Sequence, residues 1–231
     1  MITLEHLVAG YHGKAVTQPL SGTFAAGSMT AIIGANGTGK STLLKTLLRL
    51  QPPVSGHLSF AGGTAPRAAW LPQLAEMDRQ FPATVYDVVC MGNWPGRSLF
   101  SGFNRQHRLY VSDAIERVGL SELHRQPIET LSGGQFQRML FARLLVQNAP
   151  LVLLDEPFTG IDAQTSRFLM KLVCQMHDAG QTVIAVLHDN ALVKSHFPQV
   201  LLLSSEACRW GRAAEILPHY QPTSLNLALS A

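Results

Sequence analysis

The stretch MTAIIGANGTGKSTLLKTLL, residues 29–48, constrains the fold of this chain more than any other part of the sequence. An apolar run typical of a buried strand leads into G-x-x-x-x-G-K-S, residues 34–41, and a helical pattern follows. Glycines in such a loop let backbone N–H groups turn inward, and the helix N-terminus adds its positive dipole end. The order of strand, glycine loop and helix predicts an α/β fold that binds a nucleotide by its phosphates.

We call residues 34–41 the phosphate loop and expect its side chains to have distinct roles. Lys40 is expected to reach the β- and γ-phosphates, and the Ser41 hydroxyl to bind Mg²⁺. The residues expected to contact the nucleotide here are Gly34, Ala35, Asn36, Gly37, Thr38, Gly39, Lys40, Ser41 and Thr42.

Two carboxylates follow a second apolar run, LVLLDEP, residues 151–157. Ligands of α/β sheets lie outside the carboxyl ends of the strands, so Asp155 and Glu156 are expected to face the phosphates. Asp155 suits the shell of a magnesium ion. Glu156 is placed to polarise a water molecule for attack on the γ-phosphorus.

Two further polar residues are candidates for the same edge of the sheet. His188 follows the apolar strand TVIAVL, residues 182–187, and its imidazole could contact the γ-phosphate and steady the attacking water. The amide of Gln73, in WLPQ, could reach the magnesium ion or the water. Taken singly, a histidine at a strand end and a lone glutamine are usually structural.

The LSGGQ segment, residues 131–135, is a second glycine-rich stretch. Ser132 and Gln135 have the spacing of a capping box, and an apolar stripe at helical spacing follows at Phe136, Met139, Leu140 and Leu144. Gly133 and Gly134 would let an anion approach the exposed N–H groups. The segment is therefore either a second anion site or an ordinary capped helix without a ligand.

The rest of the chain suggests how the core is organised. Residues 40–50 are predicted to form a helix that QPP stops. Residues 163–180 are predicted to form a helix with Phe168, Leu172 and Met176 on one face and Gly180 as its stop. Residues 74–147 show helical stretches and no convincing strand, whereas the first 30 residues and residues 55–71 resemble a small sheet.

We therefore predict an α/β fold: a phosphate-loop ATPase core with a mainly parallel sheet, a small N-terminal antiparallel β region and an inserted helical subdomain. Residues 1–231 are predicted to form one domain. Its core would be about 1–73 and 148–231, and its helical subdomain about 74–147.

Composition excludes several classes of protein. Charged residues make up 14% of the chain, against roughly 25% in ordinary soluble domains. The net charge of +3 does not come from a basic run: even the densest basic stretch, residues 97–108, has ordinary spacing of its charges. Nucleic acid is therefore not predicted as a partner. Cys174 and His177 lack a second ligand pair and are interpreted as helix residues. No apolar run approaches the ~20 residues that span a bilayer.

GANGTGKS, LSGGQ, LLDEP and VLHD, in this order and spacing, resemble the ATP-binding subunit of an ABC transporter over essentially the whole chain. The resemblance implies that ATP and Mg²⁺ are bound and that ATP is hydrolysed. It also implies a head-to-tail homodimer. Each ATP would lie between one chain's phosphate loop and the LSGGQ segment of the other, whose Ser132, Gly133, Gly134 and Gln135 would contact the γ-phosphate.

The same resemblance implies roles for other residues. Tyr11 falls where the family stacks an aromatic ring on adenine, and Gln73 falls in the loop that links the core to the helical lobe. Asp162 falls where an aspartate contacts the opposite subunit. Gly160 and Ile161 replace the small polar residue and alanine usual before it, which we expect to tune that interface.

Residues 81–95 and 131–145 are similar to those of ATPases of zinc and manganese importers. This implies an integral membrane permease as partner, a solute-binding protein that acts indirectly, and a peripheral position on the cytoplasmic face of the bacterial inner (plasma) membrane. The alternatives are the ATPase of an iron-chelate or cobalamin importer, a soluble ABC ATPase of DNA repair or the ribosome, and a small-molecule kinase. The LSGGQ segment and His188 argue against the kinase.

Overall fold

The computed structural model describes residues 1–92 and 105–220. The chain divides into two compact units, Met1–Thr64 with Ile184–Ala231, and Ala65–Val183. These boundaries differ from the predicted division at residues 73 and 148, which stays a prediction. The basic stretch from residue 97 to 104 and the last residues of the importer-like stretch, 93–95, lie outside the described residues.

The first unit contains a small antiparallel sheet in the strand order β4-β1-β6. Its strands are β1 (Ile2–Val8), β4 (Leu20–Phe24) and β6 (Ser55–Phe60). A short hairpin follows β1 and consists of β2 (Gly10–Tyr11) and β3 (Lys14–Ala15). Side chains alternate between the two faces of such a sheet, and Ile2, Leu4 and Leu20 lie on its buried face. This confirms the predicted antiparallel β region, except at the end of the expected range 55–71: Ala68–Leu71 form a strand that pairs in parallel with residues 151–154 and not with the small sheet.

The first unit also contains the strand that leads into the phosphate loop, β5 (Met29–Gly34), in which every residue is buried. It pairs in parallel with β10 (Gln199–Leu203), and β11 (Arg209–Arg212) pairs antiparallel with β10. The remaining regular elements of this unit are α1 (Lys40–Leu47), α6 (Asn190–His196), α7 (Ala213–Ile216) and η5 (Leu217–His219).

Helix α1 ends earlier than predicted. Leu48 is its C-cap, and Arg49 takes the left-handed conformation with φ of 58°. The N–H of Arg49 donates to the carbonyl of Thr46 at 2.9 Å, and that of Leu50 to the carbonyl of Lys45 at 3.0 Å. This pair of bonds is the Schellman motif, which satisfies carbonyls that a helix end leaves free. The turn, and not the following QPP, therefore stops the helix.

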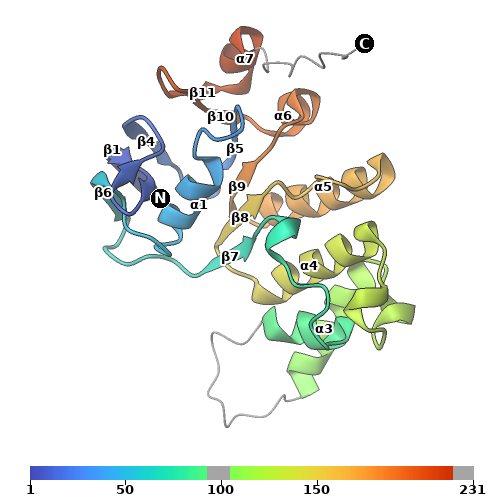
Figure 1. The fold of residues 1–231 in the computed structure, drawn as a ribbon. Helices are drawn as coiled ribbons and strands as arrows, with labels where there is room; N and C mark the ends of the chain where they lie inside the picture. Colours follow the sequence, from blue (N-terminus) through green and yellow to red (C-terminus); the bar gives the residue numbers. More distant parts are fainter. Residues whose placement is uncertain (93–104, 221–231) are drawn as a thin grey trace, which may run out of the picture. The chain divides into compact units, whose positions relative to one another are not determined.

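The second unit combines two parallel strands with helices (Figure 1). The strands are β7 (Ala68–Leu71) and β8 (Leu151–Asp155). The helices are α2 (Val85–Cys90), α3 (Arg105–Arg117), α4 (Gly133–Gln147) and α5 (Ala163–Asp178), with single turns η1 (Leu74–Glu76), η3 (Ser121–Leu123) and η4 (Ile128–Thr130). Strand β9 (Thr182–Val186) follows α5, and the division between the units falls within it.

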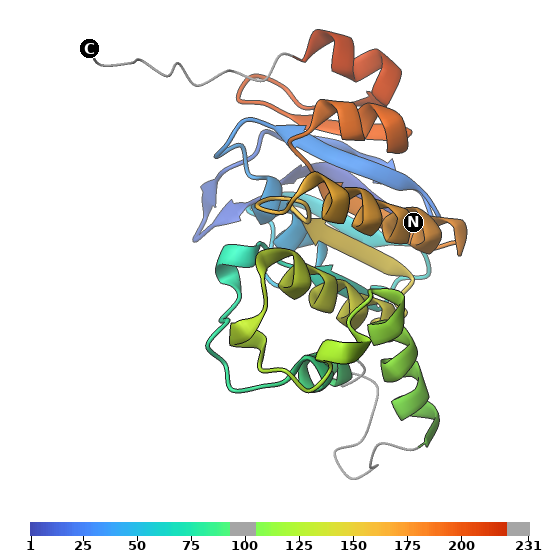
Figure 2. The same cartoon turned by 90° about the vertical axis from the view of Figure 1, so that its right-hand side faces the viewer.

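Helix α4 is the centre of the second unit. It contacts α2, α3, α5 and β7, and Figure 2 shows it packed against α3, the two drawn in yellow-green and green. The predicted stripe of Phe136, Met139, Leu140 and Leu144 is buried, at most 3% exposed. Within the described part of residues 74–147 the structure has helices, turns and one isolated bridge, and no strand, which confirms the predicted helical region.

Helix α5 agrees with the prediction at its end and differs on its buried face. Gly180 has φ of 87°, and the N–H of Gln181 donates to the carbonyl of Met176 at 3.1 Å, so glycine occupies the left-handed position of a second Schellman motif. Leu172 and Met176 are buried as predicted, but Phe168 is only half-buried. None of the helices in residues 1–92 and 105–220 is long and apolar enough to cross a lipid bilayer.

Candidate nucleotide-binding site

The phosphate loop owes its shape to its glycines. Gly37 and Gly39 have φ of 81° and 91°, in the left-handed region that only glycine enters freely. A Cβ atom at Gly39 would lie 2.7 Å from Cγ2 of Thr17, whereas one at Gly37 would meet nothing within 4 Å. Gly39 is therefore required by the protein's own packing, while the surroundings of Gly37 are open.

Lys40 is held inside the loop. Its side chain is only 6% exposed, and Nζ donates to the carbonyls of Gly34 at 2.9 Å and Ala35 at 2.8 Å. The hydroxyl of Thr38 donates to the carbonyl of Ala35 at 2.9 Å. A buried ammonium group beside the N-terminus of a helix suits a phosphate, because both favour negative charge. The residues of this loop therefore fit the group that the sequence predicts.

Two other predicted residues lie in the same unit as the phosphate loop. The N–H of Leu187 donates to the carbonyl of Ile32 in β5 at 3.1 Å, so His188 follows beside the end of the strand that leads into the loop. The His188 side chain is exposed. Tyr11 is 43% exposed at the tip of the β2–β3 hairpin. An exposed aromatic ring there is available to stack on a base.

The second unit brings Gln73 and Glu156 together. Nε2 of Gln73 donates to Oε1 of Glu156 at 3.1 Å, and the hydroxyl of Thr159 lies 3.4 Å from Oε2. Glu156 has φ of 51°, a conformation that costs energy in a residue other than glycine and that gathers at functional sites. Asp155, the last residue of β8, is 1% exposed.

The structure also shows a contact that the sequence did not predict. Gln137 of α4 is 1% exposed, and its Nε2 donates to the carbonyl of Pro157 at 2.6 Å. Pro157 directly follows Glu156, so this amide ties the helix of the LSGGQ segment to the backbone beside the acid. The only signal in the sequence was a polar residue between the buried positions Phe136 and Met139.

The LSGGQ segment forms the predicted capping box. The hydroxyl of Ser132 accepts from the N–H of Gln135 at 3.2 Å, and Oε1 of Gln135 accepts from the N–H of Ser132 at 2.9 Å. Gly133 and Gly134 do not have the left-handed φ of the phosphate-loop glycines. A Cβ atom would lie 3.7 Å from the nearest atom at Gly133 and 3.2 Å from the Thr165 hydroxyl at Gly134. The fold itself barely requires glycine at these positions.

Asp162 lies beside this segment as the N-cap of α5. Its Oδ1 accepts from the N–H of Thr165 at 2.8 Å, and its Oδ2 from the hydroxyl of Thr165 at 2.7 Å. These hydrogen bonds favour the carboxylate and lower the pKa of Asp162 below its ordinary value. A Cβ atom at Gly134 would lie 3.6 Å from Oδ2 of Asp162, so the two predicted contacts with a second subunit are neighbours in one unit.

The predicted magnesium ligands offer the atoms that this ion prefers. Ser41 would supply a hydroxyl, Asp155 a carboxylate and Gln73 an amide oxygen, and hard cations such as Mg²⁺ bind oxygen. Ser41 belongs to the first unit, and Asp155 and Gln73 belong to the second. Their joint use by one ion stays a prediction.

Comparison with known proteins agrees with this arrangement. Residues 17–159 match the ABC transporter family. The chain is 36% identical over 214 residues to the manganese transport system ATP-binding protein MntB of Bacillus subtilis, a match that covers 91% of this chain and 86% of that protein. It is 37% identical over 207 residues to the zinc transport system ATP-binding protein TroB of Treponema pallidum, covering 88% and 78%.

The fold is that of a solved ATP-binding cassette from an ABC transporter, described in a dimeric post-hydrolysis state with ADP and Pi. The TM-score is 0.80 at 21% identity, and the match covers 92% of this chain and 99% of that one. The family match spans well over half of the sequence and includes the phosphate loop, the LSGGQ segment and both carboxylates. The chain therefore belongs to the ABC transporter family, as an ATP-hydrolysing member.

Proposed function

We propose that this chain is the ATPase subunit of a transporter that imports a divalent metal cation, zinc or manganese, through a separate permease. Relatives at 36% and 37% identity are named as ATP-binding proteins of a manganese and a zinc transport system. ATP hydrolysis would supply the work of import, and the cargo would pass through the permease without touching this chain.

One observation carries the proposed mechanism: neither Gly133 nor Gly134 has a left-handed backbone, and a Cβ atom would come no nearer than 3.7 Å to another atom at Gly133 and 3.2 Å at Gly134, so the fold does not strictly require glycine at either position. Glycine in a helix costs stability relative to alanine, by up to ~1 kcal/mol, and here no left-handed turn requires it. A ligand that approaches the backbone closely would require it. Because a solved cassette of the same fold is a dimer, we assign that ligand to the ATP of a second subunit.

Within this homodimer we propose a role for each predicted residue. Tyr11 stacks on adenine, the phosphate loop from Gly34 to Thr42 holds the phosphates, and Asp162 meets the opposite subunit. Ser41 and Gln73 would hold Mg²⁺, with Asp155 in its shell, and the ion would supply positive charge to neutralise the phosphates. Glu156 orients and polarises the attacking water, Gln73 fixes that carboxylate through its 3.1 Å hydrogen bond, and His188 contacts the γ-phosphate.

We also propose the setting in which the dimer works. Its partners would be an integral membrane permease and, indirectly, a solute-binding protein, and it would lie peripherally on the cytoplasmic face of the bacterial inner membrane. A family member of this type binds its permease from the surface, which agrees with the low share of charged residues, 14%. An importer of iron chelates or cobalamin remains the alternative for the cargo.

The test is uptake of labelled zinc, manganese and ferric chelate by cells that contain the chain and its own permease. Glu156→Gln should abolish uptake of zinc or manganese, because the amide keeps the bond to Gln73 but cannot polarise water. Glu122→Gln, at an exposed position of η3, is the matched control. Loss of chelate uptake alone would contradict the metal-cation proposal and assign the alternative, and unchanged uptake of all three would contradict both.

A further inference from the structure

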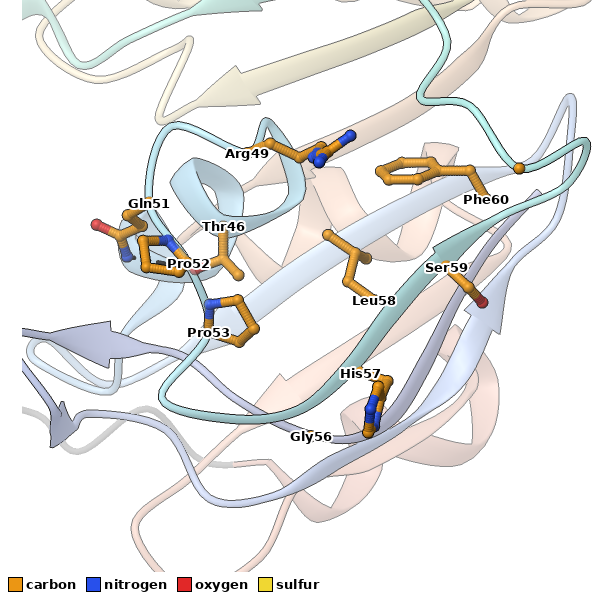
Figure 3. A pocket seen from close by; sticks show the side chains of 11 residues that line it. Thr46, Arg49, Gln51, Pro52, Pro53, Gly56, His57, Leu58, Ser59 and Phe60 are labelled. Carbon is orange, nitrogen blue, oxygen red and sulfur yellow. Dashed lines mark hydrogen bonds between the residues drawn. The ribbon is translucent and has the colours of Figure 1, made fainter.

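The first unit contains a cavity of about 640 Å³ that no step of the proposed function uses. It lies between the end of α1, the turn at residues 49–53 and one face of β6 (Figure 3). Its volume falls in the range of small-molecule sites, roughly 300–1,000 Å³. Its wall and rim indicate which class of ligand it would take.

The wall is apolar and incompletely covered by the protein. Ile2 and Leu4 of β1 pair with Phe60 and Leu58 of β6, so the four side chains share one face of the sheet. Ile2 and Leu4 are 2% and 1% exposed, whereas Leu58 and Phe60 are only half-buried. Figure 3 shows these two side chains pointing toward the turn, while His57 points away. Leu58 and Phe60 thus leave apolar surface in the cavity for a ligand to bury.

The rim carries a cation in a strained position. Arg49 occupies the left-handed site of the Schellman motif, where α5 has Gly180. Glycine takes this conformation without steric cost and arginine does not. A helix C-terminus favours a positive charge, but Lys45 already supplies one in the last turn of α1. Backbone stability therefore does not explain an arginine at position 49. A role for its charged side chain does.

Two other polar side chains of the cavity, Gln51 and Thr46, already have hydrogen-bond partners within the protein. Nε2 of Gln51 donates to the carbonyls of Gly10 and Thr42 and to the Thr46 hydroxyl, at 3.1 to 3.3 Å, and that hydroxyl donates to Thr42. The Arg49 side chain is exposed and has no hydrogen-bond or ion-pair partner among the described residues. No acidic side chain occurs among the described residues that line the cavity.

We propose that this cavity is a binding site for a small organic monocarboxylate with an apolar ring or branched chain. The carboxylate pairs with the forked guanidinium of Arg49, and the apolar body covers Leu58 and Phe60. One cation above an apolar wall suits a single negative charge, whereas a polyphosphate needs several donors and cations. The site is independent of the nucleotide site and of the cargo.

The experiment is a titration of the full chain, saturated with ADP and Mg²⁺, with 3-phenylpropionate, followed by NMR or calorimetry. A saturable site with Kd on the order of a millimolar or tighter is expected for a ligand of this size. The equally long cation 3-phenylpropylamine should bind at least about tenfold more weakly, because it meets Arg49 with like charge. No saturable binding, or equal binding of the two compounds, would overturn the proposal.

Variants of Arg49 separate loss of the site from loss of the fold. Arg49→Gly should weaken carboxylate binding about tenfold or more while raising the melting temperature, since it relieves the left-handed strain. Arg49→Gln, which keeps much of the side-chain length, should weaken binding as much, and Arg209→Gln on β11 should leave it unchanged. Unchanged carboxylate binding by either Arg49 variant would contradict a role for Arg49. Displacement of the carboxylate by a higher ADP concentration would show that it binds at the nucleotide site instead.

Discussion

The phosphate loop and the LSGGQ segment are both glycine-rich starts of helices, yet they use glycine for different reasons. In the phosphate loop, Gly39 has φ of 91° and would collide with Thr17 if it carried a side chain. In the LSGGQ segment, Gly133 and Gly134 have no left-handed backbone, and a Cβ atom would come no nearer than 3.7 Å and 3.2 Å to another atom. The phosphate loop needs Gly39 to fold, whereas the fold of the second unit does not strictly require Gly133 and Gly134, which is what the proposed contact with a second subunit's ATP would explain.

The polar groups of the two segments show the same contrast. Lys40 is 6% exposed, and its ammonium group donates to two carbonyls of its own loop. The phosphate loop therefore holds its own charged side chain in place. Ser132 and Gln135 satisfy each other at the helix N-terminus, and Ser132 is exposed. The N-terminus of this helix therefore has its capping hydrogen bonds without a ligand, and Ser132 is accessible to one. A glycine pair is therefore most informative about function where the fold does not need it.

The largest expected effect is on hydrolysis, through Lys40→Ala. Removing the ammonium group held in the phosphate loop should lower ATPase activity at least about 100-fold, the loss typical of an electrostatic contact to a developing charge. Activity is measured as phosphate release at saturating ATP. Lys171→Ala, at an exposed position of α5, should leave it unchanged. Turnover above a tenth of that of the unaltered chain would show that Lys40 is not the phosphate contact.

A smaller effect, on stability, separates the glycines. Gly39→Ala should destabilise the chain by about 2 kcal/mol, because alanine must take a left-handed φ and displace Thr17. Gly134→Ala should change the free energy of unfolding by less than about 0.5 kcal/mol, since the gain in helix propensity offsets the 3.2 Å contact with Thr165. Both values come from urea unfolding.

Gly134 is also expected to matter for association of the chains. Gly134→Ala should abolish ATP-dependent association of the chains despite its normal stability, because the added methyl group occupies the space left for the other subunit's ATP. Association is measured by light scattering with and without ATP. Normal association of a stable Gly134→Ala protein would show that the glycine does not serve to admit that ATP.

The smallest effect is a pH dependence at Asp162. Hydrogen bonds from Thr165 lower the pKa of Asp162 in the folded chain, so the charged form contributes stability above the unfolded pKa of about 3.9. That contribution is lost as the pH falls through the lower pKa of the folded state. The stability difference between the unaltered chain and Asp162→Asn should therefore shrink in urea unfolding from pH 6 to pH 3.

The control for this dependence is Asp113→Asn, at an exposed position of α3. Its stability difference from the unaltered chain should change less over the same range than that of Asp162→Asn. A difference that grows as the pH falls would have the wrong sign and would contradict the stabilising role of the Thr165 hydrogen bonds.

Features set by neighbouring residues could be predicted from the sequence. The apolar runs of β5, β8 and β9 and the capping box of Ser132 with Gln135 depend on contacts within a few positions, and all are present. The helical content of the described part of residues 74–147 followed from the same local patterns.

Features set by distant residues could not be predicted. The Gln137 bond to Pro157 spans 20 positions. Gln73 and Glu156 were expected at one edge of the sheet, but the hydrogen bond between them, which spans 83 positions, was not predicted. The early end of α1 was missed because Arg49 takes a left-handed conformation that the sequence pattern assigns to glycine. The cavity over Leu58 and Phe60 depends on that same turn, so it too had no signal in the sequence.

The most direct test of the central claim, that each ATP lies between the phosphate loop of one chain and the LSGGQ segment of the other, uses mixed dimers. All chains carry Glu156→Gln so that bound ATP is kept, and the ATP retained per purified heterodimer is counted. If the claim holds, pairing a Lys40→Ala chain with a Ser132→Arg chain leaves one intact site, and one ATP is retained. In the second pair, one chain carries both Lys40→Ala and Ser132→Arg and the other carries neither. No intact site is then left, and no ATP is retained. The reverse result, no ATP in the first pair and one in the second, would show that both segments act on the same chain's nucleotide.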